Sequence, residues 1–301
     1  MHIDLFLAHA IKNFFIINKG MKIAYFMKKK GEKMKVVILA GGLGTRLSEE
    51  THLKPKPMVE IGGKPILWHI MKSYSNFGYN EFIICCGYKG YIIKEYFANY
   101  LLHNSDVTIN LQDRSIDMHA NNSEPWKVTL IDTGEETLTA GRLKKLHPYL
   151  KDEKQFFFTY GDGLSDLNFD KLKKFHLTHK KIATMTAIKP PGRYGAVSMM
   201  QCGKVKSFEE KPPGDGGYIN GGFFVLSNEI FSQLTNENLS WESKPLIDLV
   251  ESEQLMAFRH EGFWCAMDTL REKNLLHKEE PLHLPFFFLH SLVFRPICHK
   301  Q

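Results

Sequence analysis

The sequence lacks the residue patterns of disulfide frameworks, catalytic zinc sites and serine hydrolases. Only 5 of its 301 residues are cysteine, and they show neither paired zinc spacing nor a disulfide pattern. Its 14 histidines form no HxxxH pair on a recognisable helix. No GxSxG motif occurs. These absences argue against zinc and serine-nucleophile chemistry, and the low cysteine usage predicts a cytoplasmic protein.

A membrane-spanning run and a strong charge surplus are also missing. The apolar stretch from Leu5 to Ile17 is interrupted by His9, Lys12 and Asn13, which makes it too short and too polar to cross a bilayer. The positive charges follow this stretch, whereas those of a signal peptide precede it. The net charge is only +6 and the basic residues are scattered. We therefore expect neither membrane insertion nor a nucleic-acid partner.

Short apolar strands and helices alternate from residue 34 onward. This alternation predicts an α/β fold with a Rossmann-like, doubly wound, mostly parallel sheet. The expected strands are 36–40, 81–86, 107–111, 127–132 and 155–160, and the expected helices are 65–77, 89–102 and 141–150.

After Ile188 the pattern changes to short strands and Pro/Gly-rich loops. We expect a smaller antiparallel β portion there, with strands around Gly203 and at 218–226, 255–260 and 263–267, and a last helix from Thr269. This portion should lie over the carboxyl edge of the sheet, where open α/β folds bind ligands. In domain terms, we expect 1–33 to be an N-terminal extension outside the fold, 34–276 to be the domain, and 277–301 to be an atypical tail.

A glycine-rich turn follows the first strand and has the chemistry of a phosphate site. Gly41, Gly42 and Gly44 lack a Cβ, so backbone N–H groups can approach an anion closely. Arg46 supplies two parallel donors, and Lys56 lies in a stiff Lys-Pro-Lys-Pro segment. The third glycine of a dinucleotide fingerprint is absent, which argues against an oxidoreductase, and no Gly-Lys-Ser/Thr follows.

Two aspartates follow predicted strands. Asp162 lies past strand 155–160, on the edge where the glycine turn lies, and Asp268 follows an apolar segment at a helix start. On residues alone, Asp162 is a Mg²⁺ ligand or a turn aspartate, and Asp268 is a ligand or a helix cap. Glu210 and Lys211 have an equally ordinary alternative as a surface ion pair.

The motifs together resemble those of the sugar-1-phosphate nucleotidylyltransferases, and across 34 to about 276 most of all the cytidylyl-transferring branch of that family. The motifs are GGLGTRL (41–47), KPKPM (54–58), GGKPIL (62–67), GYK (87–89), YGDG (160–163), FEEKP (208–212) and INGGF (219–223). This resemblance implies Mg²⁺-dependent transfer of a cytidylyl group from CTP to α-D-glucose 1-phosphate, which gives CDP-glucose and pyrophosphate. It also implies a role in lipopolysaccharide O-antigen and deoxysugar synthesis.

The resemblance also implies a set of site residues. Arg46 and Lys56 would be catalytic, and Asp162 and Asp268 would bind the metal. The nucleotide would contact Leu39, Ala40, Gly41, Gly42, Gly44, Thr45, Arg46, Lys56, Thr137, Arg142 and Gly161. The sugar phosphate would contact Gly195, Glu210, Lys211, Asn220 and Gly221.

Arg142 would reach the nucleotide of a neighbouring subunit, so the resemblance implies a homo-oligomer with shared sites. Two alternatives remain at this point. The chain could use dTTP or UTP, because backbone carbonyls can read a base without leaving a sequence signal. It could also be an inactive relative that binds a nucleotide sugar, given its unusual termini.

Overall fold

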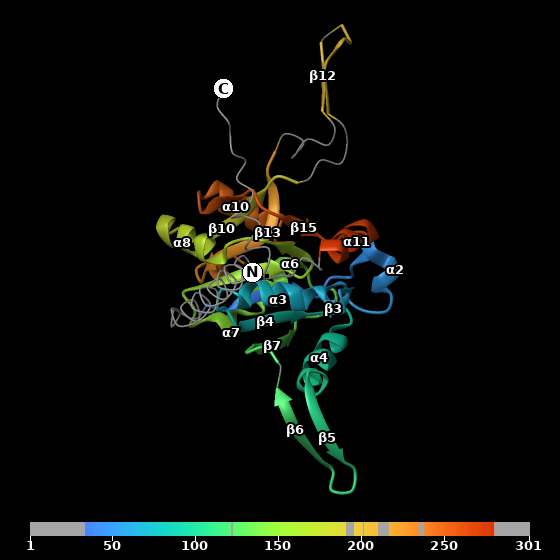
Figure 1. Ribbon diagram of the computed structural model, residues 1–301. Coiled ribbons are helices and arrows are strands. Elements are labelled where there is room, and N and C mark those ends of the chain that lie inside the picture. Colours follow the sequence, from blue (N-terminus) through green and yellow to red (C-terminus); the bar gives the residue numbers. More distant parts are fainter. Residues whose placement is uncertain are drawn as a thin grey trace, which may run out of the picture. The chain divides into compact units, whose positions relative to one another are not determined.

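The computed structural model describes residues 34–121, 123–190, 196–200, 202–209, 217–234 and 238–279 (Figure 1). They belong to a compact unit that begins at Met34. The expected extension 1–33 lies outside the described residues, as do Gly195, Glu210 and Lys211. Of the expected tail, only 277–279 are described, and they end the last helix.

A seven-stranded sheet forms the centre of this unit, in the order β14-β10-β13-β8-β1-β4-β7. All strands are parallel except β13, which runs antiparallel to both neighbours. In this order the strands are Leu255–His260, Ala183–Ile188, Ile219–Ser227, Gln155–Tyr160, Val36–Ala40, Glu81–Cys86 and Lys127–Asp132. This mostly parallel sheet confirms the predicted Rossmann-like fold.

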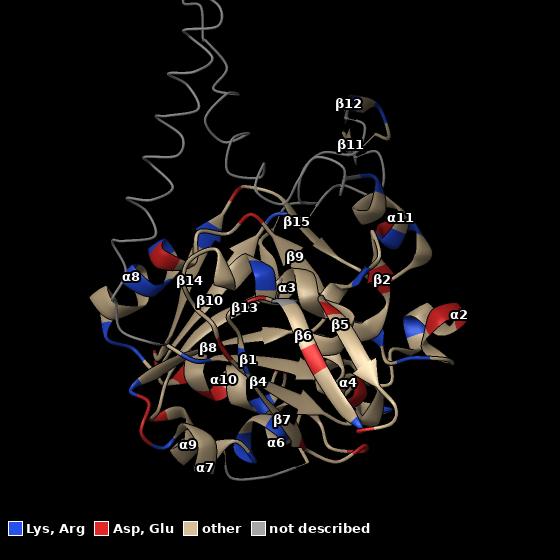
Figure 2. Ribbon diagram, turned by 60° about the horizontal axis from the view of Figure 1, so that its bottom comes forward, with Lys and Arg blue, Asp and Glu red and all other residues tan. Residues whose placement is uncertain are grey.

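Helices cover both faces of the sheet. Alternate residues of β1 enter two separate cores, with Val36 and Ile38 in one and Val37 and Leu39 in the other. Helices α3 (Ile66–Ser75), α4 (Gly90–Ala98) and α8 (Phe169–His179) pack on the first core. Helices α6 (Thr139–Lys144), α7 (His147–Leu150), α9 (Ile230–Gln233) and α10 (Lys244–Glu251) pack on the second. Figure 2 shows charged residues gathered in the helices and loops around the largely uncharged strands. Because β1 is apolar and buried at every position, both faces of the sheet must be covered, which favours the doubly wound arrangement.

The helices are short. Their bounds are α2 Ser48–Thr51, α3 Ile66–Ser75, α4 Gly90–Ala98, α5 Tyr100–His103, α6 Thr139–Lys144, α7 His147–Leu150, α8 Phe169–His179, α9 Ile230–Gln233, α10 Lys244–Glu251 and α11 Leu270–Glu279. Two 3₁₀ turns, η1 and η2, span Thr45–Leu47 and Lys56–Met58. No helix in the described part of the chain is long and apolar enough to cross a membrane.

Among the described residues, four small two-stranded sheets accompany the central sheet. They pair β2 (Glu60–Ile61) with β3 (Lys64–Pro65), β5 (Ser105–Asn110) with β6 (Ser115–Asn121), β9 (Gly163–Ser165) with β15 (Trp264–Ala266), and β11 (Ala196–Met199) with β12 (Val205–Glu209). The β5–β6 hairpin projects away from the central sheet (Figure 1).

The structure differs from the sequence prediction in three respects. The expected helix 89–102 is divided at Asn99 into α4 and α5, and 141–150 is divided into α6 and α7, with Pro148 in the first turn of α7. The second half of the chain does not lie only over the carboxyl edge. Of the strands that follow Ile188, β13 and β14 belong to the main sheet because their apolar residues pack into the same two cores.

Candidate active site

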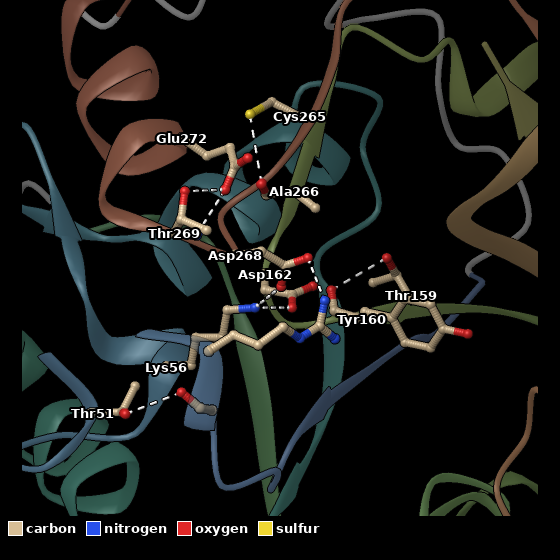
Figure 3. A network of polar contacts seen from close by, with 12 residues as sticks. Thr51, Lys56, Thr159, Tyr160, Asp162, Cys265, Ala266, Asp268, Thr269 and Glu272 are labelled. Atoms are coloured by element: carbon tan, nitrogen blue, oxygen red, sulfur yellow. Dashed lines mark hydrogen bonds and ion pairs between the residues drawn. The ribbon is translucent and has the colours of Figure 1, made fainter. Parts of the chain in front are cut away.

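Three charged side chains meet at the carboxyl edge of the sheet. Nζ of Lys56 lies 2.5 Å from Oδ2 of Asp162 and 2.7 Å from Oδ1 of Asp268 (Figure 3). Burial works to lower the pKa of Lys56, but the two carboxylates outweigh it and raise the pKa above its usual value. Lys56 is therefore a fixed positive charge in this site.

The local sequence explains this convergence. Asp162 follows β8, which lies beside β1 in parallel register, so the residues after both strands share one edge. Lys56 begins η2 between two prolines, and only 8% of its surface is exposed. Asp268 follows β15, and the backbone N–H of Met267 donates to the Asp162 carbonyl at 2.8 Å. Because Met267 directly precedes Asp268, this hydrogen bond holds the backbone of the two aspartates close together.

Arg46 reaches the same site from the glycine turn. Gly44 adopts a left-handed conformation with φ of 66°, which starts η1 and directs Arg46 toward Asp268. Its Nη1 lies 2.7 Å from Oδ2 of Asp268, yet 76% of the Arg46 side chain remains exposed. The guanidinium can therefore bind an anionic ligand while it keeps its contact with Asp268.

A cleft of about 490 Å³ opens over these charges. Ten residues singled out from the sequence line it: Leu39, Ala40, Gly42, Gly44, Thr45, Arg46, Lys56, Gly161, Asp162 and Asn220. Four further lining residues were not predicted: Pro57, Thr139, Tyr160 and Glu242. Gly161 can only be glycine, because a Cβ there would lie 2.5 Å from the carbonyl oxygen of Leu39. Gly221 lines a smaller adjoining cavity instead, and its carbonyl accepts from Trp264 Nε1 at 2.7 Å.

Arg142 lies beneath the glycine turn of its own chain. It is only 3% exposed, and its guanidinium donates to the carbonyls of Gly41 at 2.9 Å and Gly134 at 2.7 Å, and to Thr133 Oγ1 at 2.6 Å. It reaches Gly41 because neither Gly41 nor Gly87 has a Cβ; one added at Gly41 would lie 2.2 Å from Nη1. In this structure Arg142 therefore braces the turn, and its contact with a neighbouring subunit's nucleotide stays a prediction.

Thr137 belongs to the same bracing segment. Its Oγ1 accepts a hydrogen bond from Lys145 Nζ at 3.2 Å. Gly41, Thr137 and Arg142 do not line the cleft in the described part of the chain. The geometry of the cleft therefore does not support their predicted nucleotide contacts, which stay predictions.

The two aspartates have the chemistry of a divalent-cation site. Hard cations take oxygen ligands, and the oxygens of Asp162 and Asp268 already converge on one positive atom, Nζ of Lys56. Both carboxylates are partly open, with 28% and 23% of their side chains exposed. Among the described residues no group of three or more His, Cys, Asp or Glu gathers to hold a metal. Two protein carboxylates suit an ion that shares its remaining positions with phosphates and water.

The family model for nucleotidyl transferases matches residues 35–265. The chain therefore belongs to the nucleotidyl transferase family. It is 60% identical over 243 residues to the glucose-1-phosphate cytidylyltransferase of Salmonella typhi, which covers 81% of this chain and 94% of the relative. It is also 46% identical over 244 residues to the probable glucose-1-phosphate cytidylyltransferase of Bacillus subtilis, with the same coverage. The resemblance read from the motifs is confirmed.

Solved structures agree with the fold. HddC from Yersinia pseudotuberculosis superposes with a TM-score of 0.60 at 25% identity, covering 82% of this chain and 99% of that protein. A UDP-glucose pyrophosphorylase complexed with UDP-glucose superposes with a TM-score of 0.59 at 14% identity, covering 83% and 99%, and supports the fold alone.

Proposed function

We propose that this chain transfers a cytidylyl group from CTP to α-D-glucose 1-phosphate. A phosphate oxygen of the sugar forms a bond to the α-phosphorus of CTP, the bond from that phosphorus to the bridging oxygen breaks, and pyrophosphate leaves. The observation that carries this proposal is the convergence of Lys56, Asp162 and Asp268 beside the phosphate turn. The choice of substrates follows from the two relatives, which are named as a glucose-1-phosphate cytidylyltransferase and a probable one.

The charged residues have separate tasks in this reaction. Arg46, exposed at the cleft wall, binds the outer phosphates of CTP, and the backbone of Gly42 and Gly44 lies against them. Lys56, fixed by its prolines and positively charged, stabilises the charge that builds up at the α-phosphate. No covalent intermediate with the protein is required, because positioning and charge neutralisation carry phosphoryl-type transfer.

We propose Mg²⁺ as the metal of this site, with Asp162 and Asp268 as its protein ligands. When bound, it neutralises phosphate charge and orients the reacting phosphates. The two aspartates also hold Lys56 in place, so the site retains its shape through the hydrogen bonds described above.

The sugar phosphate is proposed to bind beside Asn220 and Gly221. Asn220 lines the main cleft, and its Oδ1 accepts the backbone N–H of Gly222 at 2.8 Å, which orients the amide. Gly195, Glu210 and Lys211, which lie outside the described residues, complete this proposed subsite.

The protein is further proposed to act in the cytoplasm as a homo-oligomer that feeds surface-polysaccharide synthesis. The support for an oligomer is an apolar surface on the β5–β6 hairpin, where Ile109, Leu111, Ile116 and Met118 are between 51% and 86% exposed. An isolated hairpin with an uncovered apolar surface is only marginally stable in water.

Pyrophosphate release with Mg²⁺, glucose 1-phosphate and, separately, CTP, UTP, dTTP, GTP or ATP tests this function. We expect release with CTP. Release with dTTP or UTP instead would keep the chemistry and overturn the base. No release by folded protein in any reaction would favour an inactive nucleotide-sugar-binding chain.

A further inference from the structure

A second polar network lies in the wall of the same cleft, and the mechanism above does not use it. Glu242, Tyr160 and Thr139 all line the cleft. The Tyr160 hydroxyl donates to Oε1 of Glu242 at 2.5 Å, and Thr139 Oγ1 donates to Oε2 at 3.0 Å. The Ser240 hydroxyl also donates to Oε2. Glu242 is thus held from both sides of its carboxylate.

Both supports of Glu242 are anchored in the fold. Thr139 Oγ1 accepts the backbone N–H of Trp241 at 2.7 Å, and Trp241 is fully buried in the second core. The Tyr160 hydroxyl accepts from Nδ2 of Asn220 at 3.2 Å. The orientation of the carboxylate is therefore fixed relative to both α6 and β13, and it does not move freely in solvent.

The carboxylate is ionised and faces the cleft. Partial burial works to raise its pKa, but the hydrogen bonds from Ser240, Tyr160, a backbone N–H and Thr139 outweigh it and lower the pKa. An ionised carboxylate only accepts hydrogen bonds, and its three side-chain donors are neutral hydroxyls. Glu242 is an exposed residue on the cleft wall, so a bound ligand can reach its carboxylate.

The chemistry of the cleft limits what this carboxylate can bind. A carboxylate repels phosphate, and Arg46 and Lys56 pair with Asp162 and Asp268, not with Glu242. An acceptor-only group that is held by neutral hydroxyls suits a neutral donor. We propose that Glu242 is a specificity-determining residue that accepts a hydrogen bond from a hydroxyl group of a bound sugar ring.

Two sugar rings could supply that hydroxyl: the ribose of the nucleotide and the pyranose of the sugar phosphate. Hydrogen bonds connect Glu242 to both predicted binding regions. Tyr160 links it to Asn220 of the proposed sugar-phosphate subsite. Thr139 links it to the segment that contains Thr137, a predicted nucleotide contact. This proposal rests on the proposed function, because it takes the two substrates from there.

The test compares substrates that lack single hydroxyls in the wild type and in Glu242→Ala. The readouts are kcat/KM for pyrophosphate release and calorimetric affinity, with CTP against dCTP and glucose 1-phosphate against its 2-, 3-, 4- and 6-deoxy analogues. We expect one analogue to lose about 10- to 100-fold against its parent in the wild type, since a hydrogen bond to a charged group is lost. In Glu242→Ala that penalty should shrink to about threefold or less, because the acceptor is already gone.

Ser240→Ala is the matched control. It removes one donor to Glu242 but keeps the carboxylate, and Ser240 does not line the cleft in the described residues, so full discrimination should persist. Glu242→Met, which keeps a similar side-chain length but has no carboxylate oxygen, replaces Glu242→Ala if that variant does not fold.

Three outcomes overturn the proposal. The variant could keep the full penalty for every analogue, or lose affinity equally for parents and analogues, as a merely structural role would produce. With UTP added to the substrates, the variant could also alter only the preference for CTP over UTP, which would assign the contact to the base. If the wild type releases no pyrophosphate, the proposed function fails, and calorimetry with the same ligands still decides the role of Glu242.

Discussion

Lys56 and Asp162 are 106 positions apart in the sequence, and the structure brings Nζ of one to 2.5 Å from Oδ2 of the other. This contact forms because β1 and β8 are parallel neighbours, so the segments that follow them meet at one edge. Asp268 joins the same ammonium at 2.7 Å. One lysine therefore holds together two carboxylates that would otherwise repel each other.

Lys56→Met should affect turnover and metal binding in opposite directions. Turnover should fall by about 100-fold or more, because the charge beside the α-phosphate is lost. A divalent cation should bind the nucleotide-free variant more tightly than the wild type, because the ammonium no longer competes for Asp162 and Asp268. Titration with Mn²⁺ measures this affinity.

Lys54→Met is the control for that experiment. Lys54 lies in the same Lys-Pro-Lys-Pro segment but pairs with Glu60 at 2.9 Å. Its replacement should leave Mn²⁺ affinity unchanged. Weaker Mn²⁺ binding in Lys56→Met than in the wild type would contradict the shared-cation account.

Gly41→Ala and Gly42→Ala should differ in stability although the residues are adjacent. A Cβ at Gly41 would lie 2.2 Å from Arg142 Nη1, and Arg142 cannot move without breaking its buried hydrogen bonds. We expect Gly41→Ala to lower the free energy of unfolding by about 2–3 kcal/mol. A Cβ at Gly42 meets nothing within 4 Å, so its cost should be below about 1 kcal/mol. Denaturant unfolding measures both, and equal losses would exclude the bracing role of Arg142.

His176 should make stability depend on pH. Burial, and secondarily His179, lowers the pKa of His176 from 6.5 to about 4, and its ring contacts Thr184 Oγ1 at 2.8 Å and Ser227 Oγ at 3.1 Å. The unfolded chain takes up this proton below pH 6.5, whereas the folded chain does not until about pH 4. Neutral His176 therefore contributes its full stabilisation above pH 6.5, and this contribution is lost as the pH falls from 6.5 to about 4.

The measurement is unfolding at pH 7 and pH 4.5 for wild type and His176→Gln, which retains polar contacts and leaves His179 and Lys181 in place. Between the two pH values, the wild type should lose about 2–3 kcal/mol more than the variant. Replacement of exposed His103 by Gln is the control. Parallel pH profiles for wild type and His176→Gln would contradict the assignment.

The β5–β6 hairpin should carry the contact between subunits. Ile109 and Ile116 are cross-strand partners and are 52% and 53% exposed. Replacing both by Asp should reduce the molar mass in solution, measured by light scattering, because charges would enter the proposed contact. Asp117→Ser, at the neighbouring register position, should leave the mass unchanged. A wild-type monomer, or an unchanged mass in the double variant, would exclude this surface.

The central strands could be predicted from the sequence because their apolar runs end at glycine or at polar residues. The expected 36–40, 81–86, 127–132, 155–160 and 255–260 match β1, β4, β7, β8 and β14 in their bounds. The shared edge of Asp162 and the glycine turn also followed from the predicted parallel sheet, because both come directly after a strand. The structure places residues of that turn and Asp162 in the lining of one cleft.

Contacts that depend on tertiary packing could not be predicted. Glu242 stands in a segment without a recognisable motif, and it enters the cleft only because Trp241 is buried and Thr139 lies opposite. Arg142 lies in the expected helix 141–150, and its burial depends on the absence of Cβ atoms at Gly41 and Gly87, which the sequence alone does not bring near it. In both cases the position is set by a partner about 100 residues away in the sequence.

Asp162→Asn tests the central claim most directly, because it keeps the shape of the side chain and removes one of the two charges that Lys56 holds together. The measurement is pyrophosphate release from CTP and glucose 1-phosphate with Mg²⁺, alongside thermal unfolding of the same preparation. We predict that turnover falls by about 100-fold or more while the fold is retained, because Lys56 still pairs with Asp268. Near wild-type turnover in folded Asp162→Asn would contradict the assignment of this cluster as the catalytic centre.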